Sequence, residues 1–214
     1  MTKEERLKKR HQAEKRFRFY GLTSIFVALL FVVILVQNIF SKGSSAFKKT
    51  VITTEIFFDR ELLEFQNGAS QEEIMEADFY DVMIENLIKA YPAKDRDEED
   101  ELLRLFSGDA EIEIKKAFLK DNNLLGKTIT LDLTASDDID QLHKGNYPRD
   151  LPEERRRISD FQLVIYDYFV ENEKISKNFN NYFFNNGDSR DPELAGIGGA
   201  LVGSFYSFLI CLLW

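Results

Sequence analysis

Residues 19–41 read FYGLTSIFVALLFVVILVQNIFS and contain no Asp, Glu, Lys or Arg. Because an α-helix rises about 1.5 Å per residue, this stretch would reach roughly 35 Å and could cross a hydrocarbon core of about 30 Å. Residues 194–214 are equally free of formal charge. All the charged residues, 28 basic and 37 acidic, therefore lie outside these two stretches, which excludes a purely soluble protein.

The flanks of the first apolar stretch predict its orientation. Residues 1–18 hold eight basic and three acidic side chains, a balance of +5, whereas the residues after Ser41 hold 20 basic and 34 acidic ones, a balance of −14. Cytoplasmic flanks are enriched in Lys and Arg, so we predict a basic cytoplasmic arm over residues 1–18 and a periplasmic domain over residues 42–191. The arm could neutralise nucleic-acid phosphates, but its attachment to a span makes lipid headgroups the nearer polyanion.

A cleaved signal peptide is the competing interpretation of the first stretch. A basic region precedes it, and Ser44-Ser45-Ala46 offers small residues for cleavage. Signal apolar regions are about 7–15 residues long, however, and Leu22 to Val36 alone fills that length. Because aromatic and aliphatic residues extend the stretch on both sides, we predict an uncleaved transmembrane helix over residues 19–41.

The section between the apolar stretches is long enough for one compact domain. Alternating apolar and polar residues predict strands over residues 51–59 and 128–134. Three- and four-residue apolar spacing predicts helices at Phe79–Ala90 (before Pro92), at Leu102–Phe106, at Ile112–Leu119 and after a capping box at Ser159. The predicted fold class is a membrane protein in which transmembrane α-helices flank a helix-dominated α+β extracytoplasmic domain.

The sequence offers no arrangement suited to catalysis or metal binding. Its two histidines, His11 and His143, would lie on opposite sides of the membrane, and no P-loop, HExxH or GxSxG motif occurs. Residues 196–201 lack the third glycine of a dinucleotide fingerprint. The single Cys211 excludes a disulfide framework. We therefore predict no catalytic residue, no cofactor and no metal, and we place His143 at a helix C-terminus.

Two charged runs have both a binding and a structural interpretation. The acidic run at residues 95–101 resembles a calcium loop, but Phe106 stands where an EF-hand needs a bidentate Glu, so a solvated helix start is predicted. The run Arg155-Arg156-Arg157, with Arg149 nearby, could bind an anion. Exposed charges are commonly just solvated, so a solvated face is the preferred interpretation of these arginines.

A second transmembrane helix is predicted over residues 192–214. Asp191 would be its N-cap and Pro192 its first residue, where no amide donor is needed. Small residues then recur every fourth position and include a GxxxG motif, which favours packing against another helix in lipid, although glycines are common in membrane helices generally. The predicted helix-packing stripe is Ala195, Gly199, Gly203, Ser207 and Cys211.

Residues 189–203, SRDPELAGIGGALVG, resemble the start of the permease core in the PstA-type subunit of bacterial phosphate ABC transporters. Shorter segments agree in order: RLKKR at 6–10, FRFYGL at 17–22, DDID at 137–140 and RRISDFQ at 156–162. The pattern is that of the long form, in which an extra extracytoplasmic domain precedes the core, and it covers essentially the whole chain.

This resemblance implies the N-terminal portion of a permease subunit of an ATP-driven importer for inorganic phosphate in the bacterial inner membrane. Its implied partners are a PstC-type permease, a separate ATPase subunit and a periplasmic phosphate-binding protein. Residues 192–214 would begin the permease core, and the chain would end inside its first helix, so we expect a truncated chain. We carry over no transport site, and only the position of Arg190, at the predicted outer mouth, suggests an anion contact.

Electrostatics and topology leave other functions open. A section with a charge of −14 repels phosphate within a Debye length of about 8 Å, so docking or assembly is expected of the outer domain rather than capture. A membrane sensor with two spans is the main alternative, because receptors also place a domain between spans. An anchored periplasmic enzyme is a weaker alternative, since the sequence has no pairing of a nucleophile with a base.

Overall fold

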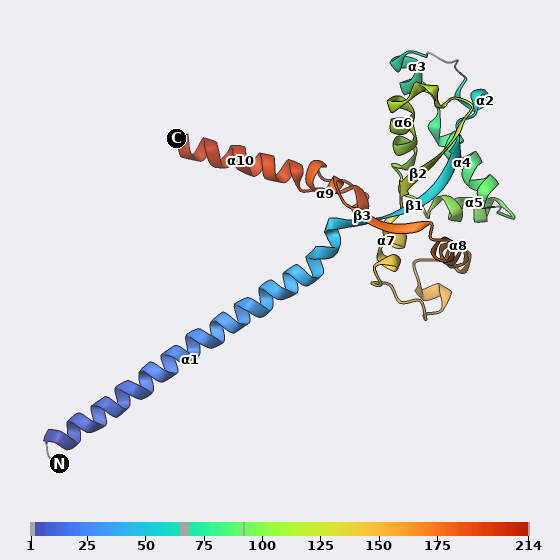
Figure 1. Cartoon of the computed structure of the whole chain (residues 1–214). Coiled ribbons are helices and arrows are strands. Elements are labelled where there is room, and N and C mark those ends of the chain that lie inside the picture. The colour runs from blue at the N-terminus through green and yellow to red at the C-terminus, as the bar shows by residue number, and fades with distance from the viewer. Residues whose placement is uncertain (1–2, 65–68, 92, 214) are drawn as a thin grey trace. The chain divides into compact units, whose positions relative to one another are not determined.

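A computed structural model describes residues 3–64, 69–91 and 93–213, and it divides into two units, Met1–Ser45 and Ala46–Trp214 (Figure 1). Helix α1 (Lys3–Gly43) makes up most of the first unit, so the basic arm and the apolar stretch are one continuous helix. The hydroxyl groups of Thr23 and Ser24 donate to carbonyls one turn earlier, which satisfies them inside the helix. By length and composition, α1 can cross a membrane.

A three-stranded antiparallel sheet organises the second unit. A short 3₁₀ turn (Ser44–Phe47) leads into β1 (Lys48–Phe57), which lies between β2 (Thr128–Thr134) and β3 (Ile175–Phe179) (Figure 1). The strand predicted at 128–134 is confirmed, and the one predicted at 51–59 begins three residues earlier and ends at Phe57. The third strand was not predicted, because only its first residue is buried and alternation is absent.

Helices α4 and α6 pack against the sheet and enclose one hydrophobic core. Phe58, Phe79 and Phe118 meet there, with ring centroids 5.2–6.5 Å apart. The other face of the sheet is polar, and the Thr53 hydroxyl donates to Asp132 across it. The helices of this unit are α2 (Arg60–Leu63), α3 (Gln71–Glu76), α4 (Phe79–Ala90), α5 (Arg96–Leu103), α6 (Ala110–Lys120), α7 (Asp137–His143), α8 (Asp160–Glu171), α9 (Tyr182–Asn185) and α10 (Gly198–Leu213), with 3₁₀ turns at Asn122–Leu124, Glu153–Arg155 and Pro192–Leu194.

Local helix signals account for most helix starts. The Ser159 capping box is present with both hydrogen bonds, and Asp95 caps α5 by accepting from the Glu98 amide, so the acidic run is a helix start as predicted. Helix α4 ends at Ala90, while Pro92 and Trp214 lie outside the described residues. The helix predicted through Phe106 is wrong at its end, because α5 stops at Leu103 and Phe106 forms a β-bridge with Ala135.

Candidate functional site

The chain enters and leaves the domain at the same end of the sheet. Lys48, the first residue of β1, pairs with Phe179, the last residue of β3. The next residue, Asn180, donates its backbone N–H to the Phe47 carbonyl (2.9 Å) and its side-chain amide to the Ala46 carbonyl (3.1 Å). The connection that comes from α1 and the connection that goes to α10 are therefore hydrogen-bonded to each other.

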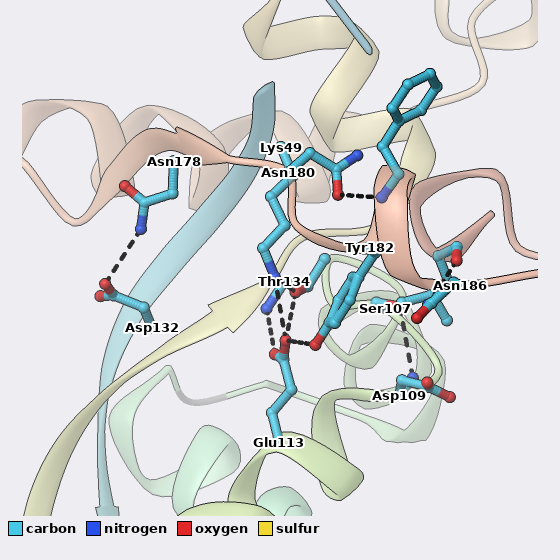
Figure 2. A network of polar contacts seen from close by, with 12 residues as sticks. Lys49, Ser107, Asp109, Glu113, Asp132, Thr134, Asn178, Asn180, Tyr182 and Asn186 are labelled. Carbon is cyan, nitrogen blue, oxygen red and sulfur yellow. Dashed lines mark hydrogen bonds and ion pairs between the residues drawn. The ribbon is translucent and has the colours of Figure 1, made fainter. Parts of the chain in front are cut away.

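A polar network centred on Glu113 of α6 lies beside this end of the sheet (Figure 2). The Tyr182 hydroxyl donates to Glu113 Oε1 (2.8 Å), and Lys49 Nζ lies 3.3 Å from the same oxygen. Thr134 donates its backbone N–H to Oε2 and its hydroxyl to Oε1, both at 2.6 Å. Four donor groups thus surround one carboxylate, three of them at Oε1 and one at Oε2.

Burial strengthens the electrostatics of this network. The side chains of Lys49 and Glu113 are only 16% and 13% exposed, and Lys49 Nζ lies 4.1 Å from the centroid of the Tyr182 ring. Burial raises the pKa of Tyr182, and the neighbouring Glu113 carboxylate raises it further, since a phenolate would be repelled there. Tyr182 therefore remains a hydrogen-bond donor, and the network fixes α6, β1, β2 and α9 to one another.

The segment from Tyr182 to Gly198 folds back on itself before α10 begins. The backbone N–H groups of Gly196 and Ile197 donate to the carbonyls of Gly187 and Phe183, both at 2.8 Å, and that of Gly198 donates to Asn186 (3.0 Å). The Asn186 side chain also donates to the Leu194 carbonyl (2.8 Å). The amides of the two residues before α10 and of Gly198, its first residue, are thus satisfied by the domain itself.

This segment corrects the predicted start of the second span. Pro192 begins a 3₁₀ turn, Asp191 makes no side-chain capping bond, and α10 begins only at Gly198. Ala195 is extended (φ −68°, ψ 142°) and separates the 3₁₀ turn from α10, and at Gly196 a Cβ atom would stand 2.3 Å from the Tyr182 carbonyl oxygen. Helix α10 extends over 16 residues, or about 24 Å, within the part of the chain that the structure describes.

The predicted helix-packing stripe is only partly in one helix. Ala195 precedes α10, whereas Gly199, Gly203 and Ser207 lie on one face of it at four-residue spacing. The Ser207 hydroxyl donates back to the Gly203 carbonyl (2.9 Å), and Gly203 has open space around it. Packing of this stripe against another helix remains a prediction.

Aromatic side chains gather next to the two chain connections. Phe47, Phe183 and Phe184 have ring centroids 5.2–5.8 Å apart, and Phe179 stacks on Phe184 at 5.8 Å. Phe179 remains 59% exposed. This aromatic cluster, Phe47, Phe179, Phe183 and Phe184, is therefore an apolar surface at the end of the domain from which both connections leave.

The other residues considered from the sequence lie apart from the network. Arg190 is exposed and makes no hydrogen bond or ion pair with any residue that the structure describes. His143 ends α7 as predicted; its Nδ1 lies 3.0 Å from the Tyr166 hydroxyl, and burial lowers its pKa. Across residues 3–64, 69–91 and 93–213, no group of three or more His, Cys, Asp or Glu side chains could hold a metal ion.

The solvated face predicted for the three consecutive arginines is wrong for Arg156. Its side chain is only 7% exposed, whereas those of Arg155 and Arg157 face solvent.

The sequence did not predict the Glu113 network. Glu113 stands in an ordinary amphipathic helix, and its partners Lys49 and Tyr182 are 64 and 69 residues away, so no local pattern marks any of them.

Comparison with known proteins places the chain in a family. A family model described as "Domain of unknown function (DUF3333)" matches residues 4–153, more than half of the chain. The chain belongs to the DUF3333 family. The match covers α1, β1 and β2 and ends at the first residue of the 3₁₀ turn Glu153–Arg155, before Arg156, α8 and β3. None of the curated proteins and none of the solved structures matches it.

Proposed function

We propose that this DUF3333 chain is the N-terminal portion of a permease subunit in an ATP-driven importer of inorganic phosphate. Its partners would be a PstC-type permease, a cytoplasmic ATPase subunit that hydrolyses the ATP, and a periplasmic phosphate-binding protein. The observation that carries the proposal is the resemblance of residues 189–203 to the start of a permease core, in a chain whose α1 can itself cross a membrane.

The position of the two chain connections supports a domain that projects from one face of a bilayer. Two membrane helices that flank a domain need attachment points close together, and here Asn180 is hydrogen-bonded to Ala46 and Phe47. The exposed aromatic cluster is suited to the bilayer interface, where aromatic side chains are enriched. We propose an inner-membrane location, with the N-terminus cytoplasmic and residues 42–191 periplasmic.

In this proposal the outer domain serves docking or assembly. The negative charge of the residues after Ser41 disfavours direct capture of phosphate. The Glu113 network holds α9 to α6 and the sheet, and the Phe183 carbonyl of α9 in turn accepts from the amide of Ile197, the residue before α10. A partner that displaces the domain would therefore pull on the start of α10 through hydrogen bonds.

Phosphate uptake and subunit co-purification test the proposal. The gene that encodes this chain would be deleted and restored with an affinity-tagged copy, and uptake of radiolabelled phosphate and the co-purifying proteins would be measured. We expect restored uptake together with a permease partner and an ATPase. If the tagged copy of the gene does not change phosphate uptake in the deletion strain, and no importer subunit co-purifies with its product, the proposal is rejected.

The Arg190 hypothesis is tested in the same cells. Arg190 is exposed, so Arg190→Gln should leave the fold intact. A contact with the passing anion predicts reduced uptake, and unchanged uptake would remove Arg190 from the phosphate path. Lys177→Gln, also an exposed cation of the domain, is the matched control.

A two-span membrane sensor remains the second candidate, because adjacent chain connections at one end of a domain suit a receptor equally well. The coding sequence downstream of residue 214 separates the two. Further apolar spans beside an ATPase gene would favour the permease, whereas a signalling domain would favour the sensor.

A further inference from the structure

The aromatic cluster turns much of its ring surface to solvent. Phe179 is 59% exposed, Phe184 43% and Phe47 38%, whereas Phe58 and Phe169 of the core are fully buried. The ring of Phe184 lies between the other two exposed rings, with interplanar angles of 12° to Phe179 and 13° to Phe47. The three exposed rings therefore form one contiguous apolar surface, and such surfaces mark sites of contact with proteins or membranes.

The segments that supply the cluster carry only positive charge. Residues 42–54 and 174–187 together hold five lysines and no Asp or Glu, although the residues after Ser41 have a balance of −14. Lys48 pairs with Phe179 across β1 and β3, so the two side chains leave the same face of the sheet. Lys48 is exposed and makes no ion pair with any residue that the structure describes. An uncompensated cation thus accompanies the aromatic surface.

The chain itself ties this surface to the apolar helix α1. Phe47 is the sixth residue after the uncharged stretch 19–41, and six residues reach at most about 20 Å. An α1 that crosses a bilayer therefore keeps Phe47 close to the bilayer surface. Asn180, which follows Phe179, donates its backbone N–H to the Phe47 carbonyl, so the rest of the cluster is held at the same place.

We propose that the aromatic cluster rests in the outer leaflet of the bilayer that α1 crosses, with Lys48 at the level of anionic phospholipid headgroups. Aromatic rings are enriched at this depth, and lysines beside it are attracted to anionic lipids. Lipid fits better than a protein partner, because the tether holds this surface at the membrane whether or not a partner is bound. The inference rests on the membrane location given under the proposed function and names lipid as the partner of this end of the domain.

Quenching of single tryptophans by brominated phospholipid tests the contact. Trp214 is the only tryptophan of the chain, so a full chain with Trp214→Phe carries one reporter after Phe179→Trp, Phe57→Trp or Phe31→Trp. Each chain is reconstituted into vesicles of phosphatidylcholine and phosphatidylglycerol in equal parts, with or without bromine on the acyl chains. Phe57 is the matched control, because it is 38% exposed and lies at the other end of β1, about 30 Å along the strand. Phe31, in the uncharged stretch, reports whether α1 is inserted.

We expect bromination to lower the fluorescence of the reporters at positions 31 and 179 by about twofold or more, because both indoles touch hydrocarbon, and to leave the reporter at position 57 unchanged. Quenching at position 31 but not at position 179 would overturn this inference in favour of a protein partner and leave the membrane location standing. Absence of quenching at position 31 would reject the membrane location and the inference with it. Phosphate uptake does not enter these readouts, so failure of the transport proposal is seen separately.

Further variants test the headgroup contact and guard against misfolding. In the chain with Phe179→Trp, Lys48→Gln should reduce the quenching by roughly a third in vesicles that contain phosphatidylglycerol, because one attraction to the anionic surface is lost. Lys116→Gln, the same change at an exposed position of α6, should leave the quenching unaltered. Equal quenching in these two variants would overturn the headgroup contact. Should Phe179→Trp fail to fold, Phe47→Trp places the reporter in the same cluster and must give the same quenching.

Discussion

Replacing Glu113 by Gln should destabilise the sheet-containing domain far more than an ordinary surface change. All four neighbours of this carboxylate are donors, whereas the Gln amide offers only one acceptor oxygen and presents an NH₂ group to another donor. Lys49, only 16% exposed, would keep its charge without a counter-ion. Breaking one partner of a buried pair costs about 3–5 kcal/mol, out of about 5–15 kcal/mol for a whole domain.

Thermal unfolding followed by near-ultraviolet circular dichroism measures this loss, because it reports tertiary packing around the tyrosines rather than helix content in the micelle. A loss of about 3 kcal/mol corresponds to a melting temperature lower by about 6–12 °C for a protein of this size. Glu111→Gln is the matched control, since Glu111 is also an acid in the first turn of α6 and its change alters only the helix-dipole interaction, by about 0.3–1 kcal/mol.

Equal melting temperatures for Glu113→Gln and Glu111→Gln would refute the reasoning, because the network would then contribute nothing beyond a first-turn acid. The double variant Lys49→Met with Glu113→Gln should recover part of the lost stability, since it removes the uncompensated charge as well. A double variant that is less stable by the full sum of the two single losses would show that the two side chains do not interact.

Three further predictions concern packing, burial and pH. Gly196→Ala should lower the free energy of unfolding by about 1–3 kcal/mol, because the new Cβ atom would overlap backbone carbonyl oxygens. Gly203→Ala is the control, since Gly203 has open space around it and the change should cost nothing. Equal melting temperatures for the two variants would contradict the close packing at Gly196. Asp140→Ala should cost about 3 kcal/mol or more, because this buried carboxylate accepts from the amide and hydroxyl of Thr50 and pairs with Lys144, whose side chain is only 10% exposed. Asp150→Ala, at an exposed position, is the comparison in urea titrations. Burial lowers the folded-state pKa of His143 below its ordinary 6.5, with Lys177 adding to the shift and Asp140 opposing it, so the unfolded chain binds more protons than the folded one. The contribution of His143 to stability is therefore full above about pH 6.5 and is lost as the pH falls toward the lower folded-state pKa. His143→Gln should flatten this part of the curve of unfolding free energy against pH.

Elements whose signals are local were predicted well. The strand at 128–134, the helix from Phe79 to Ala90 and the capping box at Ser159 each depend on residues within a few positions of one another. Elements that depend on contacts with distant segments of the chain were not predicted. Strand β3 buries little of its own surface and exists because β1 offers it an edge, and α5 ends early because Phe106 pairs with Ala135.

The sequence by itself determined the charge segregation, the apolar helix α1, the α+β character of the sheet-containing domain and the starts of the helices at Phe79, Arg96 and Asp160, since each follows from composition or from spacing along the chain. Only the tertiary structure decided that Lys49, Glu113 and Tyr182 meet, that α10 begins at Gly198 rather than at Pro192, and that the Arg156 side chain is buried. The reason is physical: a side chain's burial and its hydrogen-bond partners are set by segments far away in the chain, and no local pattern encodes them.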